Sequence, residues 1–154
     1  MLNKRIAGYT LAATLSIATA VVSTFEGLRT DAYLDPIGIP TICYGHTATA
    51  RLGERRTPEQ CKAQLSKDLL IAIEDVERRV KVPMTVERRA ALVSFAYNVG
   101  GTKFGGSTLL KKLNASDPAG ACAELSKWVY AGGVKLNGLV TRRAEERALC
   151  EVGL

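Results

Sequence analysis

The chain has 154 residues, of which 47% are hydrophobic and 23% are charged, and its formal net charge is +6. This length and apolar content predict one compact domain with a core of its own, plus a short terminal appendage. A mild basic excess suits an anionic polymer, but the basic residues are scattered among acidic ones and form no nucleic-acid-binding motif. We therefore expect no nucleic-acid partner.

The chain opens with a short basic stretch and then an uncharged run over residues 6–22, IAGYTLAATLSIATAVV. As a helix this run would rise about 25 Å, less than the roughly 30 Å hydrocarbon core of a bilayer. We interpret residues 1–22 as a weak signal-anchor, with its N-terminus in the cytoplasm, and residues 23–154 as an exported main domain. Ala18-Thr19-Ala20 also fits a signal-peptidase site, but cleavage there would leave too short a helix ahead of Glu26, so retention is favoured.

The segment over residues 25–46, FEGLRTDAYLDPIGIPTICYGH, holds most of the reactive side chains. Gly27 can take the left-handed conformation that ends a helix, which would leave Glu26 on the last turn of the N-terminal helix. An Asp-Pro pair and a following glycine separate two β-type runs and predict a small hairpin. Asp35 should lie near its turn and Thr41 on the returning strand.

These residues suit the cleavage of a glycosidic bond. That reaction needs one carboxyl group that can hold a proton and a second that stays ionised, which are roles for Glu26 and Asp35. The Thr41 hydroxyl could hold the attacking water. Two structural interpretations stay open: Ser23-x-x-Glu26 fits a capping box that begins a helix, and the lone His46 suits a buried, hydrogen-bonded role better than acid–base work. One histidine without a carboxylate cluster predicts neither a metal site nor a cofactor.

The segment resembles the catalytic signature of the T-even phage lysozyme family, glycoside hydrolase family 24, at Glu26-Gly27-Leu28-Arg29, Tyr33-x-Asp35, Gly38, Thr41-Ile42 and Gly45-His46. The resemblance implies an α+β, mainly helical fold in which a small β-containing lobe and a helical lobe flank a cleft. It also implies that Glu26 is the general acid, Asp35 the second carboxylate and Thr41 a residue that positions water.

With its weakly apolar N-terminal helix, the chain further resembles the signal-anchor-release endolysins of lambdoid phages and prophages. The resemblance implies a muramidase that is tethered inactive to the host inner membrane through residues 6–22. It would then leave the bilayer, fold the former anchor against the catalytic domain and lyse the cell from the periplasm as a monomer. Its partner would be peptidoglycan, cut at the β-1,4 bond between N-acetylmuramic acid and N-acetylglucosamine.

That mechanism places different demands on the two carboxyl groups. Glu26 should sit in an apolar pocket that keeps it protonated, whereas Asp35 should stay ionised near its turn. Asp35 and Thr41 would direct water to the opposite face of the sugar, with inversion if the carboxyl groups are far enough apart. Two other classes stay open: a lytic transglycosylase, which needs only the acid, and a non-catalytic wall-binding or membrane-permeabilising protein.

Two further helices follow the signature. Thr57-Pro58-Glu59-Gln60 predicts a capped start, and apolar residues recur at three- or four-residue spacing until Pro83. We expect this long helix to join the two lobes, with charges such as Asp68 on a solvated face. Thr85 should begin the next helix, which ends at Gly100-Gly101.

The second of these helices carries predicted sugar contacts. Phe95-x-Tyr97-Asn98-Val99-Gly100 resembles the family segment that lines the cleft opposite the acid, so Tyr97 and Asn98 are predicted to bind substrate. Ser107 and Thr108, which follow a Gly-Gly turn, are further candidates. We expect Trp128 to pack in the core rather than to stack on a sugar.

The C-terminal part contains a last predicted helix that Thr141 can cap. Arg142 and Arg143 in this helix could pair with acids of the helical lobe or meet peptide carboxylates of the cell wall, and the sequence does not decide between these partners.

Four cysteines in an exported chain favour disulfides, with three possible pairings. Cys122 and Cys150 lie on consecutive C-terminal helices and could bridge them, which would leave Cys43 and Cys61 to pair in the small lobe. Their spacing lacks the close doublets of a zinc ribbon.

Overall fold

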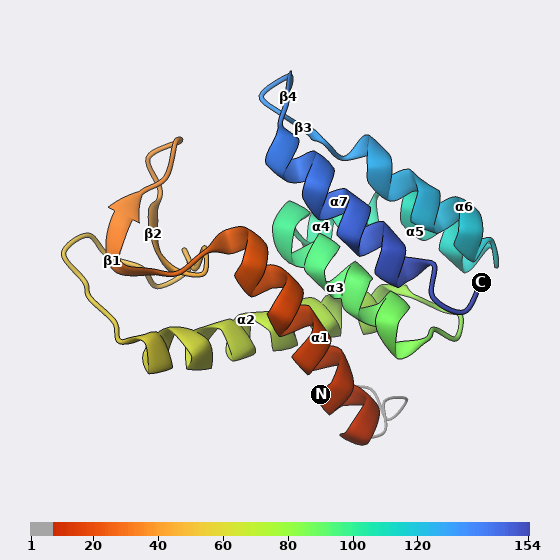
Figure 1. The fold of residues 1–154 in the computed structure, drawn as a ribbon, viewed down its shortest axis with the longest axis horizontal. Coiled ribbons are helices and arrows are strands. Elements are labelled where there is room, and N and C mark those ends of the chain that lie inside the picture. Colours follow the sequence, from red (N-terminus) through yellow and green to blue (C-terminus); the bar gives the residue numbers. More distant parts are fainter. Residues whose placement is uncertain (1–7) are drawn as a thin grey trace.

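A computed structural model describes residues 8–154 (Figure 1). The basic start and the first two residues of the predicted anchor lie outside the described residues. The helices are α1 Gly8–Glu26, α2 Pro58–Arg79, α3 Val86–Val99, α4 Gly101–Gly105, α5 Thr108–Asn114, α6 Pro118–Glu124, the 3₁₀ helix η1 Leu125–Lys127 and α7 Asn137–Cys150. The strands are β1 Arg29–Leu34, β2 Pro40–Cys43, β3 Tyr130–Ala131 and β4 Val134–Lys135. The predicted mainly helical α+β fold is confirmed.

Helix α1 ends at Glu26, as predicted, because Gly27 takes a left-handed conformation with φ +67°. The alternative in which Ser23 begins a helix is wrong, since Ser23 lies inside the last turn of α1, which ends three residues later. Helix α1 continues unbroken across residues 22 and 23, and it packs against α2 and α3. Thr14, Ala18 and Val22 on its inner side are fully buried. Among the described residues, no helix has the length and apolar character needed to cross a bilayer.

Strands β1 and β2 form the predicted antiparallel hairpin, with Tyr33 opposite Thr41 and Leu34 opposite Pro40. Asp35 lies at the turn, where its Oδ1 accepts hydrogen bonds from the backbone N–H groups of Ile37 and Ile39. The side chain of the turn residue therefore closes the loop itself, as aspartate in a turn commonly does.

Helix α2 runs from the hairpin side of the molecule to the helical lobe, as predicted (Figure 1). Thr57 and Gln60 form a capping box at its start, and Pro58 occupies its first turn. One predicted feature is wrong: Asp68 does not belong to a solvated face, because its carboxylate bonds to the buried His46. The hydrophobic periodicity predicted the buried side of the helix, but it could not predict that the hairpin side of the molecule would bring His46 to Asp68.

The helical lobe packs around α3, which contacts α1, α2 and α7. Phe95 of α3 meets Phe104 and Trp128 edge-on, with ring centroids 6.3 and 5.2 Å apart, so the core role predicted for Trp128 is confirmed. The predicted cap at Thr141 is wrong. Helix α7 begins four residues earlier, at Asn137, and the Thr141 hydroxyl bonds to the Asn137 carbonyl inside the helix.

The structure contains two disulfides, Cys43–Cys61 and Cys122–Cys150. The first ties strand β2 to the start of α2, and the second ties α6 to the end of α7. Both belong to the pairing that the helix order favoured.

Candidate active site

Glu26 lies where the helical lobe meets the hairpin. Its Oε1 accepts a hydrogen bond of 2.6 Å from Nη1 of Arg142, and its side chain is 23% exposed. On the hairpin side, a Cβ built on Gly45 would lie 3.1 Å from Glu26 Oε2, so the Gly45 backbone approaches this oxygen closely. The apolar pocket predicted for Glu26 is therefore wrong. A guanidinium group contributed by a distant helix faces this carboxyl group.

Asp35 and Thr41 are brought together by the backbone of one residue, Ile39. The Ile39 N–H donates to Asp35 Oδ1 at 2.8 Å, and the Ile39 carbonyl accepts from the Thr41 hydroxyl at 3.0 Å. Thr41 is 4% exposed. Because its hydrogen is given to a carbonyl, the Thr41 oxygen offers its lone pairs to a further donor such as water.

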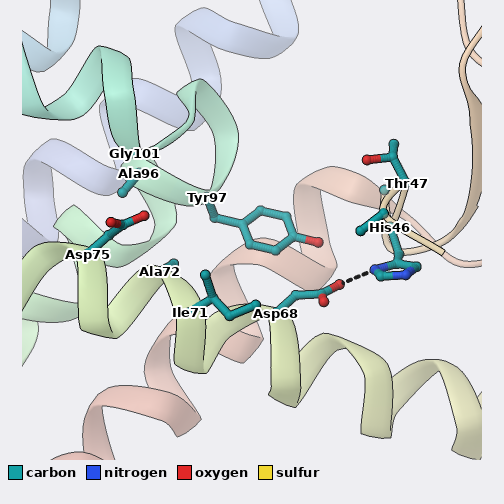
Figure 2. Close-up of a pocket in the computed structure, with 11 residues that line it drawn as sticks. His46, Thr47, Asp68, Ile71, Ala72, Asp75, Ala96, Tyr97 and Gly101 are labelled. Carbon is teal, nitrogen blue, oxygen red and sulfur yellow. Dashed lines mark hydrogen bonds and ion pairs between the residues drawn. The ribbon is translucent and has the colours of Figure 1, made fainter. Parts of the chain in front are cut away.

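A pocket of about 260 Å³ lies between the loop after β2 and the helices α2 and α3. Gly45, Asp68 and Tyr97 are among its lining residues, and Figure 2 shows the Tyr97 ring reaching from α3 toward the His46 loop. The Tyr97 hydroxyl donates to the Tyr44 carbonyl at 2.6 Å and so joins the two lobes. Burial, followed by the nearby charges of Asp68 and Glu26, raises the pKa of Tyr97 well above its usual value.

His46 is 6% exposed and fully engaged in hydrogen bonds, which confirms its predicted structural role. Its Nδ1 lies 2.8 Å from Asp68 Oδ2, and its Nε2 lies 2.8 Å from the Thr49 hydroxyl. Within residues 8–154, no group of three or more His, Cys, Asp or Glu side chains is placed to hold a metal ion.

The other predicted substrate residues occupy different surroundings. Tyr97 lines the pocket, whereas the Asn98 side-chain oxygen accepts a hydrogen bond from Arg143. Ser107 is 4% exposed and caps α5, with its hydroxyl bonded to the Phe104 carbonyl and the Leu110 N–H. Thr108 is exposed on the first turn of α5. Sugar contacts by these four residues stay predictions.

Comparison with known proteins gives the family. Residues 23–146 match the phage lysozyme family. The chain belongs to this family. The enzyme is accordingly a glycoside hydrolase of the lysozyme class, and its substrate is peptidoglycan.

Relatives and solved structures agree over most of the chain. The enzyme is 45% identical to a SAR-endolysin of bacteriophage PS119 over 81% of this chain and 75% of that protein. It is 38% identical to the SAR-endolysin of enterobacteria phage P21, over 97% and 94% of the two chains. The muramidase domain of SpmX from Asticaccaulis excentricus superposes with a TM-score of 0.82 at 37% identity, covering 87% and 94%. An endolysin of Escherichia coli O157:H7 phage FAHEc1 gives 0.80 at 33% identity, covering 90% and 92%.

Sequence reasoning missed the contact between Arg142 and Glu26. The two residues are 116 positions apart, and only the fold brings them together. A signal was nonetheless present: Arg142 and Arg143 lie four and three residues before Glu146, a spacing that pairs charges on one helix face. That spacing could have predicted the pairing with Glu146 inside the helical lobe, but it carries no information about Glu26.

Proposed function

We propose that the enzyme hydrolyses the β-1,4 bond between N-acetylmuramic acid and N-acetylglucosamine, with Glu26 as general acid. Glu26 gives its proton to the glycosidic oxygen as the bond from that oxygen to the anomeric carbon breaks. A water molecule attacks the anomeric carbon and loses a proton to Asp35, while Thr41 accepts a hydrogen bond from the same water. One observation carries the proposal: the hairpin that holds Asp35 and Thr41 through Ile39 also brings Gly45 against Glu26.

The products of digestion test this reaction. We expect mass spectrometry of purified peptidoglycan, digested in ¹⁸O-water, to find reducing N-acetylmuramic ends that carry one ¹⁸O atom. Anhydro-muramic ends would instead identify a lytic transglycosylase, and reducing N-acetylglucosamine ends would place the cut at the other linkage. Undigested peptidoglycan would leave a non-catalytic, wall-binding or membrane-permeabilising role.

We further propose that residues 6–22 first hold the enzyme at the host inner membrane, with the N-terminus in the cytoplasm. Release would then bring α1 onto the helical lobe and free a periplasmic monomer that engages no nucleic acid. Two observations support this sequence of events: the relatives carry the name SAR-endolysin, and α1 buries small side chains such as Ala18 against the lobe. A helix diluted by Ala, Thr and Ser gains little from the bilayer, which favours its exit.

Leucine on the exposed side of α1 tests the tether without disturbing its packing. Ala12 and Ser16 are exposed. The variant Ala12→Leu/Ser16→Leu should stay longer in the membrane pellet and delay lysis, because each leucine favours the bilayer. Ala63→Leu, at an exposed position of α2, is the matched control. Unchanged partition and timing in the α1 variant would remove the support for a releasable anchor.

A further inference from the structure

Behind Glu26, the helical lobe buries a cluster of charged side chains on α7. The side chains of Arg142, Arg143 and Glu146 are 4%, 1% and 0% exposed. Glu146 Oε1 accepts from Arg142 Nε at 3.1 Å and from the Ser94 hydroxyl at 2.7 Å, and its Oε2 accepts from Arg143. Buried charges are costly unless they are paired, so this arrangement fixes all of its members in one geometry.

Arg142 connects this cluster to the acid. One edge of its guanidinium group bonds Glu146, its Nη1 bonds Glu26 Oε1, and its Nη2 donates to the Ser94 carbonyl at 3.3 Å. The planar guanidinium group can reach these partners together, whereas a lysine ammonium group could not reproduce the fork.

We propose that Glu146 is a positioning residue: it fixes Arg142, which holds Glu26 Oε1 as an acceptor and thereby assigns the catalytic proton to Oε2. This inference rests on the role of Glu26 proposed above. Arginine only donates hydrogen bonds, and the unprotonated oxygen of a carboxyl group is the better acceptor, so the bond from Arg142 favours the proton on the other oxygen. The other oxygen, Oε2, is the one that Gly45 approaches at the edge of the pocket.

The charges of Glu146, Arg142 and Glu26, which we call the relay, give the proposal a measurable consequence. Two cations, Arg142 and Arg143, face two anions, Glu26 and Glu146. Among the described residues, Tyr97 of α3 also interacts with Glu26, since the charge of Glu26 contributes to the raised pKa of Tyr97. Removing Glu146 leaves excess positive charge beside Glu26, and removing Arg142 leaves excess negative charge.

Two variants and one control test the relay. Glu146→Gln keeps the shape and the Ser94 bond but loses the charge, and Arg142→Met removes the link to Glu26. We expect kcat to fall about tenfold in each with KM nearly unchanged, because the Arg142 and Glu146 side chains are buried, with 4% and 0% exposed, and offer little surface to a sugar. Glu124→Gln is the matched control, since Glu124 is also a buried helical-lobe glutamate held by two cations, Lys112 and Lys127. It should stay within about twofold of the wild type.

The pH profile separates positioning from general loss of structure. The alkaline limb of kcat/KM reports loss of the proton from the acid. It should move to lower pH in Glu146→Gln and to higher pH in Arg142→Met, each by about one pH unit, and stay in place in Glu124→Gln. If the alkaline limbs of Glu146→Gln and Arg142→Met both stay in place, or both move in the same direction, the inference is overturned. Should Glu146→Gln not fold, Arg142→Met alone decides it by the direction of its limb.

Failure here is distinguishable from failure of the proposed reaction. Wild-type digestion that yields reducing muramic ends supports the reaction whatever the two variants do. Activity retained by Glu26→Gln would instead contradict the reaction itself.

Discussion

The two lobes hold the residues that we propose to be catalytic by different means. The helical lobe has a continuous apolar core that includes Val22, Leu92 and Phe95, and Glu26 is the last residue of a helix packed on that core. The small lobe has a smaller buried cluster, which in the described part of the chain consists of Ile42, Cys43 and Cys61. Its geometry depends on short-range hydrogen bonds and one disulfide. We infer that changes in the helical lobe act first on stability, and that changes in the hairpin act first on activity.

The largest effect that this comparison predicts is in the hairpin. Asp35→Ala should lower the rate of glycan cleavage about a thousandfold, because it removes the group that we propose takes the proton of the attacking water. Release of reducing ends from purified peptidoglycan measures this rate. Asp31→Ala is the matched control, since Asp31 lies on the same hairpin and its side chain is 69% exposed. Its Oδ1 lies 3.5 Å from Arg55 Nε, which is a weak surface ion pair. Equal activity of the two variants would contradict the role of Asp35.

The two disulfides allow the lobes to be compared directly. Replacing Cys43 and Cys61 by alanine should lower activity ten- to about a hundredfold, because β2 loses its tie to α2 and Thr41 moves with it. Replacing Cys122 and Cys150 should lower the free energy of unfolding by about 3 kcal/mol and leave activity at low temperature nearly unchanged. Urea unfolding and cleavage assays on both variants provide the test. Loss of activity on removing Cys122–Cys150, with little loss on removing Cys43–Cys61, would contradict this difference between the lobes.

A smaller effect should appear at the junction of the lobes. Burial raises the pKa of Tyr97, so as the pH rises the unfolded chain loses this proton at a lower pH than the folded chain does. The stability contributed by the neutral hydroxyl is therefore fully present below about pH 10 and is lost as the pH rises above that value. Between pH 10 and 12, the wild type should therefore lose about 1 kcal/mol more stability per pH unit than Tyr97→Phe. Urea unfolding at several pH values measures this slope. Tyr130→Phe, at a site that is 61% exposed, should follow the wild type.

Much of the framework was predictable because its signals are local. Gly27 ends α1 at Glu26, the Asp-Pro turn closes the hairpin at Asp35, and Thr57 begins α2 with a capping box. Each signal depends on residues within a few positions of one another, where backbone conformation and side-chain caps act directly.

The surroundings of Glu26 were not predictable in the same way. The apolar pocket was expected because the mechanism needs a protonated acid, but the partner of the Glu26 carboxyl group is Arg142, which comes from α7. The pairing of Asp68 with His46 was missed for the same reason, since it joins α2 to a loop of the hairpin. Tertiary contacts between charged groups leave no periodic pattern in the sequence.

The most direct test of the catalytic account is the rate of cleavage of purified peptidoglycan by Glu26→Gln. Glutamine keeps the size of the side chain and can still accept the Arg142 bond, so the melting temperature should change little. We expect release of reducing muramic ends to fall at least about a thousandfold in this folded variant, because the proposed proton donor is lost. A folded Glu26→Gln enzyme that cuts the glycan within tenfold of the wild-type rate would contradict the proposal.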